Sequence, residues 1–169
     1  MSAGERIRRR ISSLEHFIKD PGKGLPEDVF LLVSRLTPLI NVDLLIKNKR
    51  GQTLLTWRDD GFFPAGWHIP GGIVRYKETM AERIQAVARS EVRAKVKCAH
   101  TPLVIREVII PSFTDRAHAI SFLFACELTG SPAKKLKFVK GAPEPGQWAW
   151  HDRPPKDLII VHRMYRNFI

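Results

Sequence analysis

The sequence predicts an α+β fold, an α/β/α sandwich in which a mixed β-sheet lies between helices. Short apolar segments typical of strands recur along the chain, and helical periodicity appears near both ends and in the middle. The two patterns do not alternate regularly, as they would in a doubly wound parallel sheet. With 169 residues, 44% of them hydrophobic and 27% charged, the chain is long enough for one compact domain.

The first 24 residues read as a basic amphipathic helical extension, ahead of a single domain over residues 25–169. Four apolar residues recur there at helical spacing before Pro21-Gly22 ends the pattern: Ile7, Ile11, Leu14 and Ile18. The arginines between them could bind a membrane surface or nucleic acid. A helix docked on its own domain with one charged face outward is the commoner case, so we assign the extension no partner.

The first half of the domain reads as a helix followed by three strands. The helix covers residues 27–35, and residues 40–46 and 53–57 read as two strands. The turn Asn48-Lys49-Arg50-Gly51 between these strands is a hairpin signal. A short strand over residues 67–69 ends at Pro70-Gly71-Gly72, where the glycines let backbone approach a ligand.

A capping box marks the start of the central helix. Glu82 follows Thr79 by three residues, and apolar residues then continue at helical spacing to about Ala94. Further strands are expected over residues 103–110, 120–128 and 147–151. Pro154-Pro155 interrupts the chain, and residues 158–168 are expected to form a closing helix.

The net charge indicates the class of ligand, and the cysteines indicate the cellular compartment. The net charge of +11 favours anionic ligands such as nucleotides, phosphorylated sugars or nucleic acid. Cys98 and Cys126 lie in apolar stretches without C-x-x-C spacing, so we expect buried free thiols of a reducing compartment and no zinc site. No apolar run approaches the roughly 18 residues of a membrane span, and no signal peptide pattern is visible. We therefore expect a cytoplasmic protein without a membrane partner.

The loop and helix between Trp67 and Ala94 carry the chemistry. Gly72, Glu78 and Glu91 match the pattern G-x5-E-x7-R-E-U-x-E-E-x-G-U, in which U is apolar, and this segment resembles the Nudix box. In that family, helix carboxylates hold magnesium, a hard cation that takes oxygen ligands, against a diphosphate. Other positions of the box are changed in this chain: Ala86, Val87, Ser90 and Arg93 stand where it has Arg, Glu, Glu and Gly.

The sequence around the box resembles one Nudix subfamily, the GDP-mannose mannosyl hydrolases, whose box is naturally degenerate. The resemblance covers roughly residues 27–169 and rests on six motifs: Thr37-Pro38-Leu39-Ile40-x-x-Asp43, Asn48-x-Arg50-Gly51, Leu54-Leu55-x-x-Arg58, Pro64-Ala65-Gly66-Trp67-x-x-Pro70-Gly71-Gly72, Glu78-Thr79, and Val161-His162-x-x-x-Arg166-x-Phe168. It implies the Nudix fold and a hydrolase of a nucleotide sugar such as GDP-mannose. Water would attack the anomeric carbon and release GDP and free sugar.

The resemblance also implies a metal site. Glu91 would bind Mg²⁺, with Mn²⁺ as a substitute, and Gly71 would contribute its backbone carbonyl. Glu78 would act as a further metal ligand or orient the loop, whereas by itself it would read as a carboxylate at the start of a helix. The metal would neutralise charge on the diphosphate.

Further residues are implied for substrate binding and catalysis. Arg58 would contact the diphosphate with its planar guanidinium and assist its departure. His118 would be the base that takes a proton from water, since its ordinary pKa suits neutral pH. Asp43 would bind the sugar or base, although a strand Asp paired with an arginine is almost as common. Two subfamily arginines fall at Ile73 and Ala86, so the diphosphate is less well neutralised, and the substrate differs or the activity is slow, unless another arginine reaches the same space. The candidates are Arg75, which we predict to bind substrate, Arg83, Arg89 and Arg116.

Three functions remain open. The nucleotide-sugar hydrolase predicts that His118, Arg58 and Glu91 converge on one cleft. An ordinary Nudix diphosphohydrolase would break a P–O bond and would want more carboxylates than this helix supplies. A catalytically weak nucleotide-binding module would keep the fold alone. A homodimer is expected from the resemblance, with a nucleotide sugar and not nucleic acid as the partner.

Overall fold

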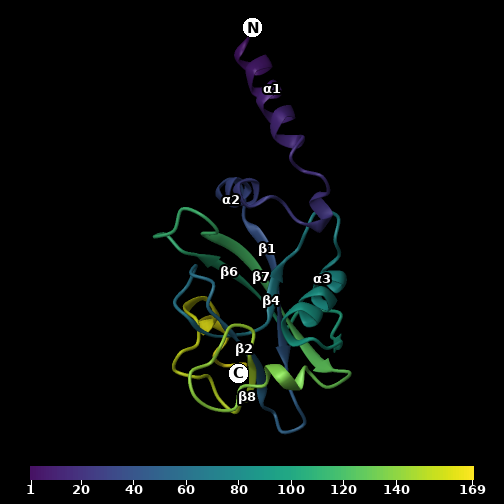
Figure 1. The fold of residues 1–169 in the computed structure, drawn as a ribbon, viewed down its shortest axis with the longest axis vertical. Helices are drawn as coiled ribbons and strands as arrows, with labels where there is room; N and C mark the ends of the chain where they lie inside the picture. The colour runs from purple at the N-terminus through teal and green to yellow at the C-terminus, as the bar shows by residue number, and fades with distance from the viewer.

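The computed structural model describes residues 1–169 (Figure 1). Its helices and strands follow in the order α1 Ala3–Glu15, η1 Pro21–Lys23, α2 Glu27–Leu36, β1 Leu39–Ile46, β2 Thr53–Arg58, β3 Gly66–His68, β4 Gly71–Ile73, α3 Met80–Val87, η2 Ala88–Val92, β5 Val96–Cys98, β6 Val104–Ile109, β7 His118–Leu128, η3 Lys134–Leu136, β8 Trp148–His151 and η4 Ile160–Tyr165. The α+β class with a mixed sheet and helices is confirmed.

The strands form two sheets. In the larger sheet β1 pairs with β4 on one side and runs parallel to β7 on the other. The far edge of β7 is shared, because β6 pairs with residues 118–123 and β5 with residues 126–128. The smaller sheet is antiparallel, in the order β3-β2-β8. β1 and β7 are therefore the two inner strands of the larger sheet.

Strand alternation on β1 separates two hydrophobic cores. Val42, Leu44 and Ile46 face α3 and pack in a cluster of 13 buried residues. Leu45 points to the opposite face and packs in a cluster of seven with residues of the smaller sheet and of the C-terminal segment, including Tyr165. Since side chains alternate along a strand, Asn41 and Asp43 share the face of Leu45. This is the face on which the functional cleft forms.

Several local expectations need correction. The turn at Asn48–Gly51 forms, but β1 and β2 belong to different sheets, and their hairpin is limited to an isolated bridge between Lys47 and Thr53. β4 and β5 were not expected, because each is only three residues long. The capping box of Thr79 and Glu82 is present, yet the helix after it changes to a π-helical turn over Ala88–Val92. The closing helix is the 3-10 helix η4.

The expectation of free thiols is wrong. Cys98 on β5 and Cys126 on β7 are joined by a disulfide. The two residues are directly opposite one another in the antiparallel pair, which is why their side chains meet. The bond closes a segment of the chain that contains β6 and the turn before β7.

Helix α1 does not dock on the domain. It begins at a capping box between Ser2 and Glu5, and none of its residues is buried. Figure 1 shows it extending away from the two sheets. The expectation that α1 covers its own domain is therefore wrong. No helix in the structure combines the length and apolar character needed to cross a bilayer.

Candidate functional site

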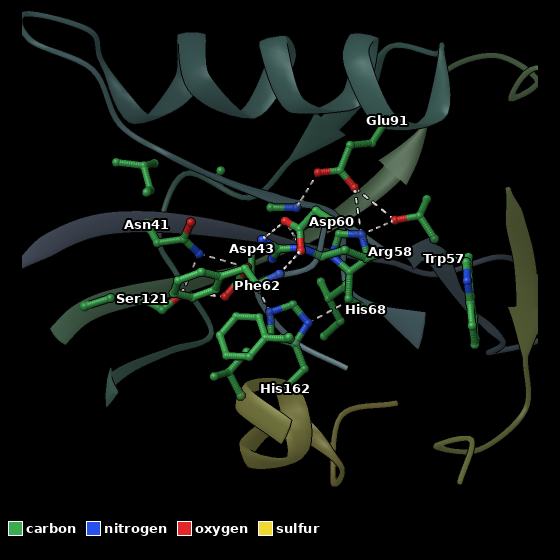
Figure 2. A pocket seen from close by; sticks show the side chains of 18 of the residues that line it. Asn41, Asp43, Trp57, Arg58, Asp60, Phe62, His68, Glu91, Ser121 and His162 are labelled. Carbon is green, nitrogen blue, oxygen red and sulfur yellow. Dashed lines mark hydrogen bonds and ion pairs between the residues drawn. The ribbon is translucent and has the colours of Figure 1, made fainter. Parts of the chain in front are cut away.

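One cleft of about 600 Å³ opens on the Asp43 face of the larger sheet. Figure 2 shows its arrangement: the helical segment that carries Glu91 lies on one side, the C-terminal η4 that carries His162 lies on the other, and Asp43 lies between them. The rest of the lining comes from β1, β2, β3, β4, β6 and β7, from η3, and from the loops after β2, between β6 and β7 and before β8.

Asp43 is the buried centre of the cleft. Only 1% of the residue is exposed. Its Oδ2 accepts hydrogen bonds from the hydroxyl of Ser121 and from Tyr165 Oη, the latter at 3.0 Å, and its Oδ1 accepts one from Asn41 Nδ2 at 2.9 Å. A buried carboxylate requires such compensation, because an unpaired charge is costly away from water. A carboxylate can accept about four hydrogen bonds, so one position on Oδ1 is still open.

His162 closes the cleft from the C-terminal side. Its Nδ1 accepts the backbone N–H of Ile69 at 2.9 Å, so the proton of the neutral ring sits on Nε2, which lies 3.7 Å from Asp43 Oδ1. Burial lowers the pKa of His162 below its usual 6.5. The ring therefore orients the Pro70-Gly71 loop as a neutral acceptor.

The two glycines allow three elements to meet. A Cβ on Gly71 would collide with the carboxylate of Asp43 and lie 3.0 Å from the carbonyl of Val42. A Cβ on Gly72 would lie 2.8 Å from Val87 on α3. Gly71 N–H also donates to Glu91 Oε1 at 3.2 Å. The Gly-Gly pair is thus explained by close packing of β4 against β1 and α3.

Glu91 lies at the end of a short hydrogen-bonded chain. The hydroxyl of Thr56 donates to Glu91 Oε2 at 2.9 Å and lies 2.8 Å from His68 Nε2. Because the hydroxyl proton of Thr56 is used in the bond to Glu91, the Thr56 oxygen accepts the bond from His68. His68 is therefore protonated on Nε2. Burial raises the pKa of the Glu91 carboxyl to about 7, although the bonds from Thr56 and Gly71 lower it. Burial also keeps the pKa of His68 well below 6.5, helped by His162.

Two arginines line the cleft beside an aromatic wall. Arg58, at the end of β2, forms an ion pair with Asp60, with Nε 2.8 Å from Oδ2, and its guanidinium carbon lies 5.4 Å from the centre of the Phe63 ring. The guanidinium of Arg116 lies 4.2 Å from the centre of the Phe62 ring. Burial lowers the pKa of Arg116, and the positive charge of Arg58 contributes. The guanidinium groups of Arg58 and Arg116 are therefore close enough in the cleft to influence one another and to contact one anionic ligand.

Four of the predicted site residues line the cleft together: Asp43, Arg58, Gly71 and Glu91. Their functional roles stay predictions. Asp43 lies in the cleft without an arginine bonded to it, which removes the alternative of a simple strand ion pair.

His118 does not join them, so the expected convergence of His118, Arg58 and Glu91 is wrong for the histidine. Ala119 and Ser121 of β7 line the cleft, and alternation turns His118 to the opposite face. There its Nε2 lies 3.1 Å from Glu107 Oε1 on the neighbouring strand. The expected strand begins at residue 120, whereas β7 begins at His118, so strand alternation fixes the direction of this side chain.

Glu78 and Arg75 also lie outside the cleft lining. The Glu78 carboxylate pairs with the buried Arg83, whose Nη2 lies 2.7 Å away, and accepts the N–H of Arg75 at 2.9 Å. Glu78 therefore orients the loop, which was the second role considered for it. The guanidinium of Arg75 lies close to Gly24, on the side where α1 joins the domain.

The cleft offers few protein ligands for a magnesium ion, so most of its ligands would have to come from substrate and water. No three His, Cys, Asp or Glu side chains are grouped as a metal site. Magnesium, however, is usually bound by one or two carboxylates and takes its other ligands from phosphate oxygens and water. Glu91, whose oxygens each accept one hydrogen bond and keep further acceptor capacity, can serve as that carboxylate next to the loop of Gly71.

Sequence reasoning missed several residues of the cleft. Thr56 lies two residues before Arg58 on β2, which was a usable signal of a shared face. His68 lies three residues before Gly71, and His162 belongs to the matched C-terminal motif. No sequence signal placed Ser121 beside Asp43, because the two strands are parallel neighbours far apart in the chain.

Comparison with known proteins shows the Nudix hydrolase fold. A MutT Nudix hydrolase from Burkholderia pseudomallei superposes with a TM-score of 0.63 at 18% identity, over 79% of this chain and 98% of that one. A Nudix-family hydrolase from Clostridium perfringens gives 0.57 at 12% identity, over 78% and 96%. A MutT protein from Methanosarcina mazei Go1 gives 0.56 at 21% identity, over 78% and 91%.

The sequence is also similar to part of a curated protein. The low-salt glycan biosynthesis protein Agl8 of Haloferax volcanii is 32% identical over 76 residues, which is 45% of this chain. The match spans about half of that relative's length, 48%. No protein-family model matches the chain.

Proposed function

We propose that the protein is a magnesium-dependent hydrolase of a nucleotide sugar, GDP-mannose or a similar compound, that releases nucleoside diphosphate and free sugar. The observation that carries the proposal is the placement of Arg58 and Arg116 beside Glu91 in one cleft. Two cations and a carboxylate able to hold a divalent ion suit a diphosphate group. The name of the Agl8 relative supports the choice of substrate, because glycans are built from activated sugars.

Arg58 and Arg116 bind the diphosphate in this proposal. Both guanidinium groups already lie over phenylalanine rings, and Arg58 is also held by Asp60, so little side-chain freedom is lost on binding. Arg116 takes the place of the subfamily arginines that fall at Ile73 and Ala86. Positive charge that waits where the departing diphosphate becomes more negative lowers the barrier to its departure.

Asp43 and Glu91 divide the remaining roles. The open acceptor position of Asp43 Oδ1 can receive a hydrogen bond from a sugar hydroxyl or from the attacking water. Glu91, with the carbonyl of Gly71, would hold magnesium, which when bound supplies further neutralisation of the diphosphate. Attack at the anomeric carbon requires the sugar to lie toward Asp43 and the diphosphate toward the arginines.

An ordinary diphosphohydrolase is the second candidate. The observation that favours it is the position of His118 outside the cleft, because the histidine base expected for attack at carbon is then missing. This reaction would place the attacking water next to phosphorus and would use the same arginines and Glu91.

The test is product analysis with labelled water. The purified protein is incubated with magnesium, H₂¹⁸O and a panel of nucleotide sugars led by GDP-mannose, and products are weighed by mass spectrometry. Free sugar together with GDP that carries no label supports the proposal, because the bridging oxygen then stayed on the diphosphate and water attacked carbon. GMP and sugar phosphate, with the label on phosphorus, would assign the second candidate. Binding of GDP-mannose without any product would make the protein a nucleotide-sugar binding module.

A further inference from the structure

Helix α1 presents an uncovered apolar stripe bordered by arginines. Ile7, Ile11 and Leu14 follow one another at helical spacing, and Ile7 and Ile11 are 59% and 51% exposed. Phe17, directly after the helix, is 72% exposed. Exposed apolar side chains in a continuous row are unusual on a water-facing helix and indicate a surface that becomes covered.

The arginines are arranged around this stripe in a specific way. With about 100° of rotation per residue, Arg6 and Arg10 fall along one border of the stripe, Arg8 falls along the other, and Arg9 points to the opposite side. Arginines at the borders can bury their aliphatic stems beside an apolar surface while their charged ends reach outward. This is the pattern of a helix that lies flat in a lipid interface with anionic headgroups.

The surface where α1 joins the domain is also cationic. An added Cβ on Gly22 would lie 3.6 Å from the carbonyl of Tyr76, and one on Gly24 would lie 3.8 Å from the guanidinium carbon of Arg75. Tyr76 is 63% exposed, and the Lys77 ammonium lies over its ring at 5.3 Å. An exposed aromatic ring among cations is a further feature of surfaces that contact headgroups.

In place of the expected absence of a membrane partner, we propose that α1 binds the surface of an anionic membrane. It would lie in the plane of the membrane with the Ile7-Ile11-Leu14 stripe in the lipid and Arg6, Arg8 and Arg10 at the headgroups. Charge selects this partner over the alternatives. A second copy of the stripe would bring the same arginine borders together, and like charges repel. Nucleic acid would satisfy the arginines but would leave the apolar stripe in water. The proposal is independent of the reaction in the cleft.

The experiment uses the full chain and sedimentation with vesicles, of phosphatidylcholine alone or mixed with phosphatidylglycerol. We expect binding to the mixed vesicles that weakens at high salt, and little binding to phosphatidylcholine alone. Ile7→Ser/Ile11→Ser should lower the binding constant by roughly tenfold or more. Because α1 has no buried residue, the unfolding midpoint of every variant should match the wild type.

Two arginine variants separate an oriented helix from unspecific attraction. Arg10→Gln removes a border charge and should weaken binding about fivefold, whereas Arg9→Gln removes the same charge from the far side and should change it about twofold or less. Equal effects of both, together with full binding by the Ile7→Ser/Ile11→Ser variant, would overturn the proposal. Three other results would also overturn it: no binding to any vesicle, dimers in sedimentation velocity that depend on α1, or oligonucleotide binding that is unchanged in the Ile7→Ser/Ile11→Ser variant.

Discussion

The backbone N–H of Gly71 donates to the side chain of Glu91 across 3.2 Å, and this bond ties the glycine loop to the end of the central helical segment. On its other side Gly71 lies against the carboxylate of Asp43. A single residue without a side chain thus lies between the carboxylates of Asp43 and Glu91 and contacts both.

Gly71→Ala should destabilise the protein by roughly 1 to 3 kcal/mol, because the new methyl group collides with the Asp43 carboxylate and crowds the Val42 carbonyl. Urea unfolding measures the change. Gly130→Ala is the matched control, since an added Cβ there meets nothing within 4 Å. Equal midpoints for the two variants would contradict the close approach at Gly71.

Glu91→Gln should abolish magnesium-dependent turnover, because a neutral amide is a poorer ligand for a hard cation than a carboxylate. The single amide oxygen can still accept the N–H of Gly71, while the amide NH2 can donate to the hydroxyl of Thr56 in place of the bond that Glu91 accepts. Turnover is measured against magnesium concentration. Glu78→Gln serves as the comparison: its partner is Arg83, so it should keep its response to magnesium and lose stability instead. A variant at Glu91 with unchanged magnesium dependence would remove the assigned metal ligand.

Arg116→Ala should lower kcat/KM by about one to two decades, the cost of one charge-assisted contact of roughly 1.5 to 3 kcal/mol made in the transition state. Steady-state kinetics on the substrate identified by product analysis gives the value. Arg75→Ala removes the same charge outside the cleft and should leave the rate nearly unchanged. The reverse order of effects would return Arg75 to the substrate site.

His118→Ala should have little effect on turnover, since His118 faces Glu107 and not the cleft. Removing a true general base costs about 10² to 10⁴ in rate, so the two outcomes are well separated. The pH–rate profile should also be unchanged. A hundredfold loss would support His118 as the base, and β7 would then have to change its register so that His118 faces the cleft.

His162 should make the fold less stable in mild acid. Its folded pKa lies below the unfolded value of 6.5 because burial disfavours the charged ring, so the unfolded chain binds the proton first. The stability from this group is complete above pH 6.5 and is lost as pH falls through the folded pKa. His162→Asn keeps an acceptor for Ile69 N–H and should flatten the decline seen in unfolding measured from pH 7 to 5. If the stability of the variant falls as steeply with pH as that of the wild type, the loss is due to other groups such as His68.

The sequence predicts the fold well where the signals are local. The capping box at Thr79, the Asn48–Gly51 turn and the apolar periods of β1 and β7 all follow from short-range physical rules. It fails where the outcome depends on pairing between distant segments. The disulfide between Cys98 and Cys126 depends on the register of β5 against β7, and the two-sheet arrangement depends on β8.

The site shows the same division. Arg58, Gly71 and Glu91 lie in matched motifs and meet in the cleft. His118 fails by one step of strand alternation, since Ala119 beside it lines the cleft. Arg116 could only be proposed among four arginines, because its position depends on the turn before β7, where it adopts a positive φ of 55°.

The π-helical turn at Ala88–Val92 holds one residue more than the corresponding turn of an α-helix. Deleting one residue upstream of Glu91 in this turn would restore the α-helical repeat and rotate its carboxylate away by about 100°. A single insertion or deletion in this turn, rather than a substitution, could therefore bring the carboxylate of Glu91 into the cleft or remove it from the cleft. Alignments of relatives should be read for gaps in this helix before they are read for missing acids.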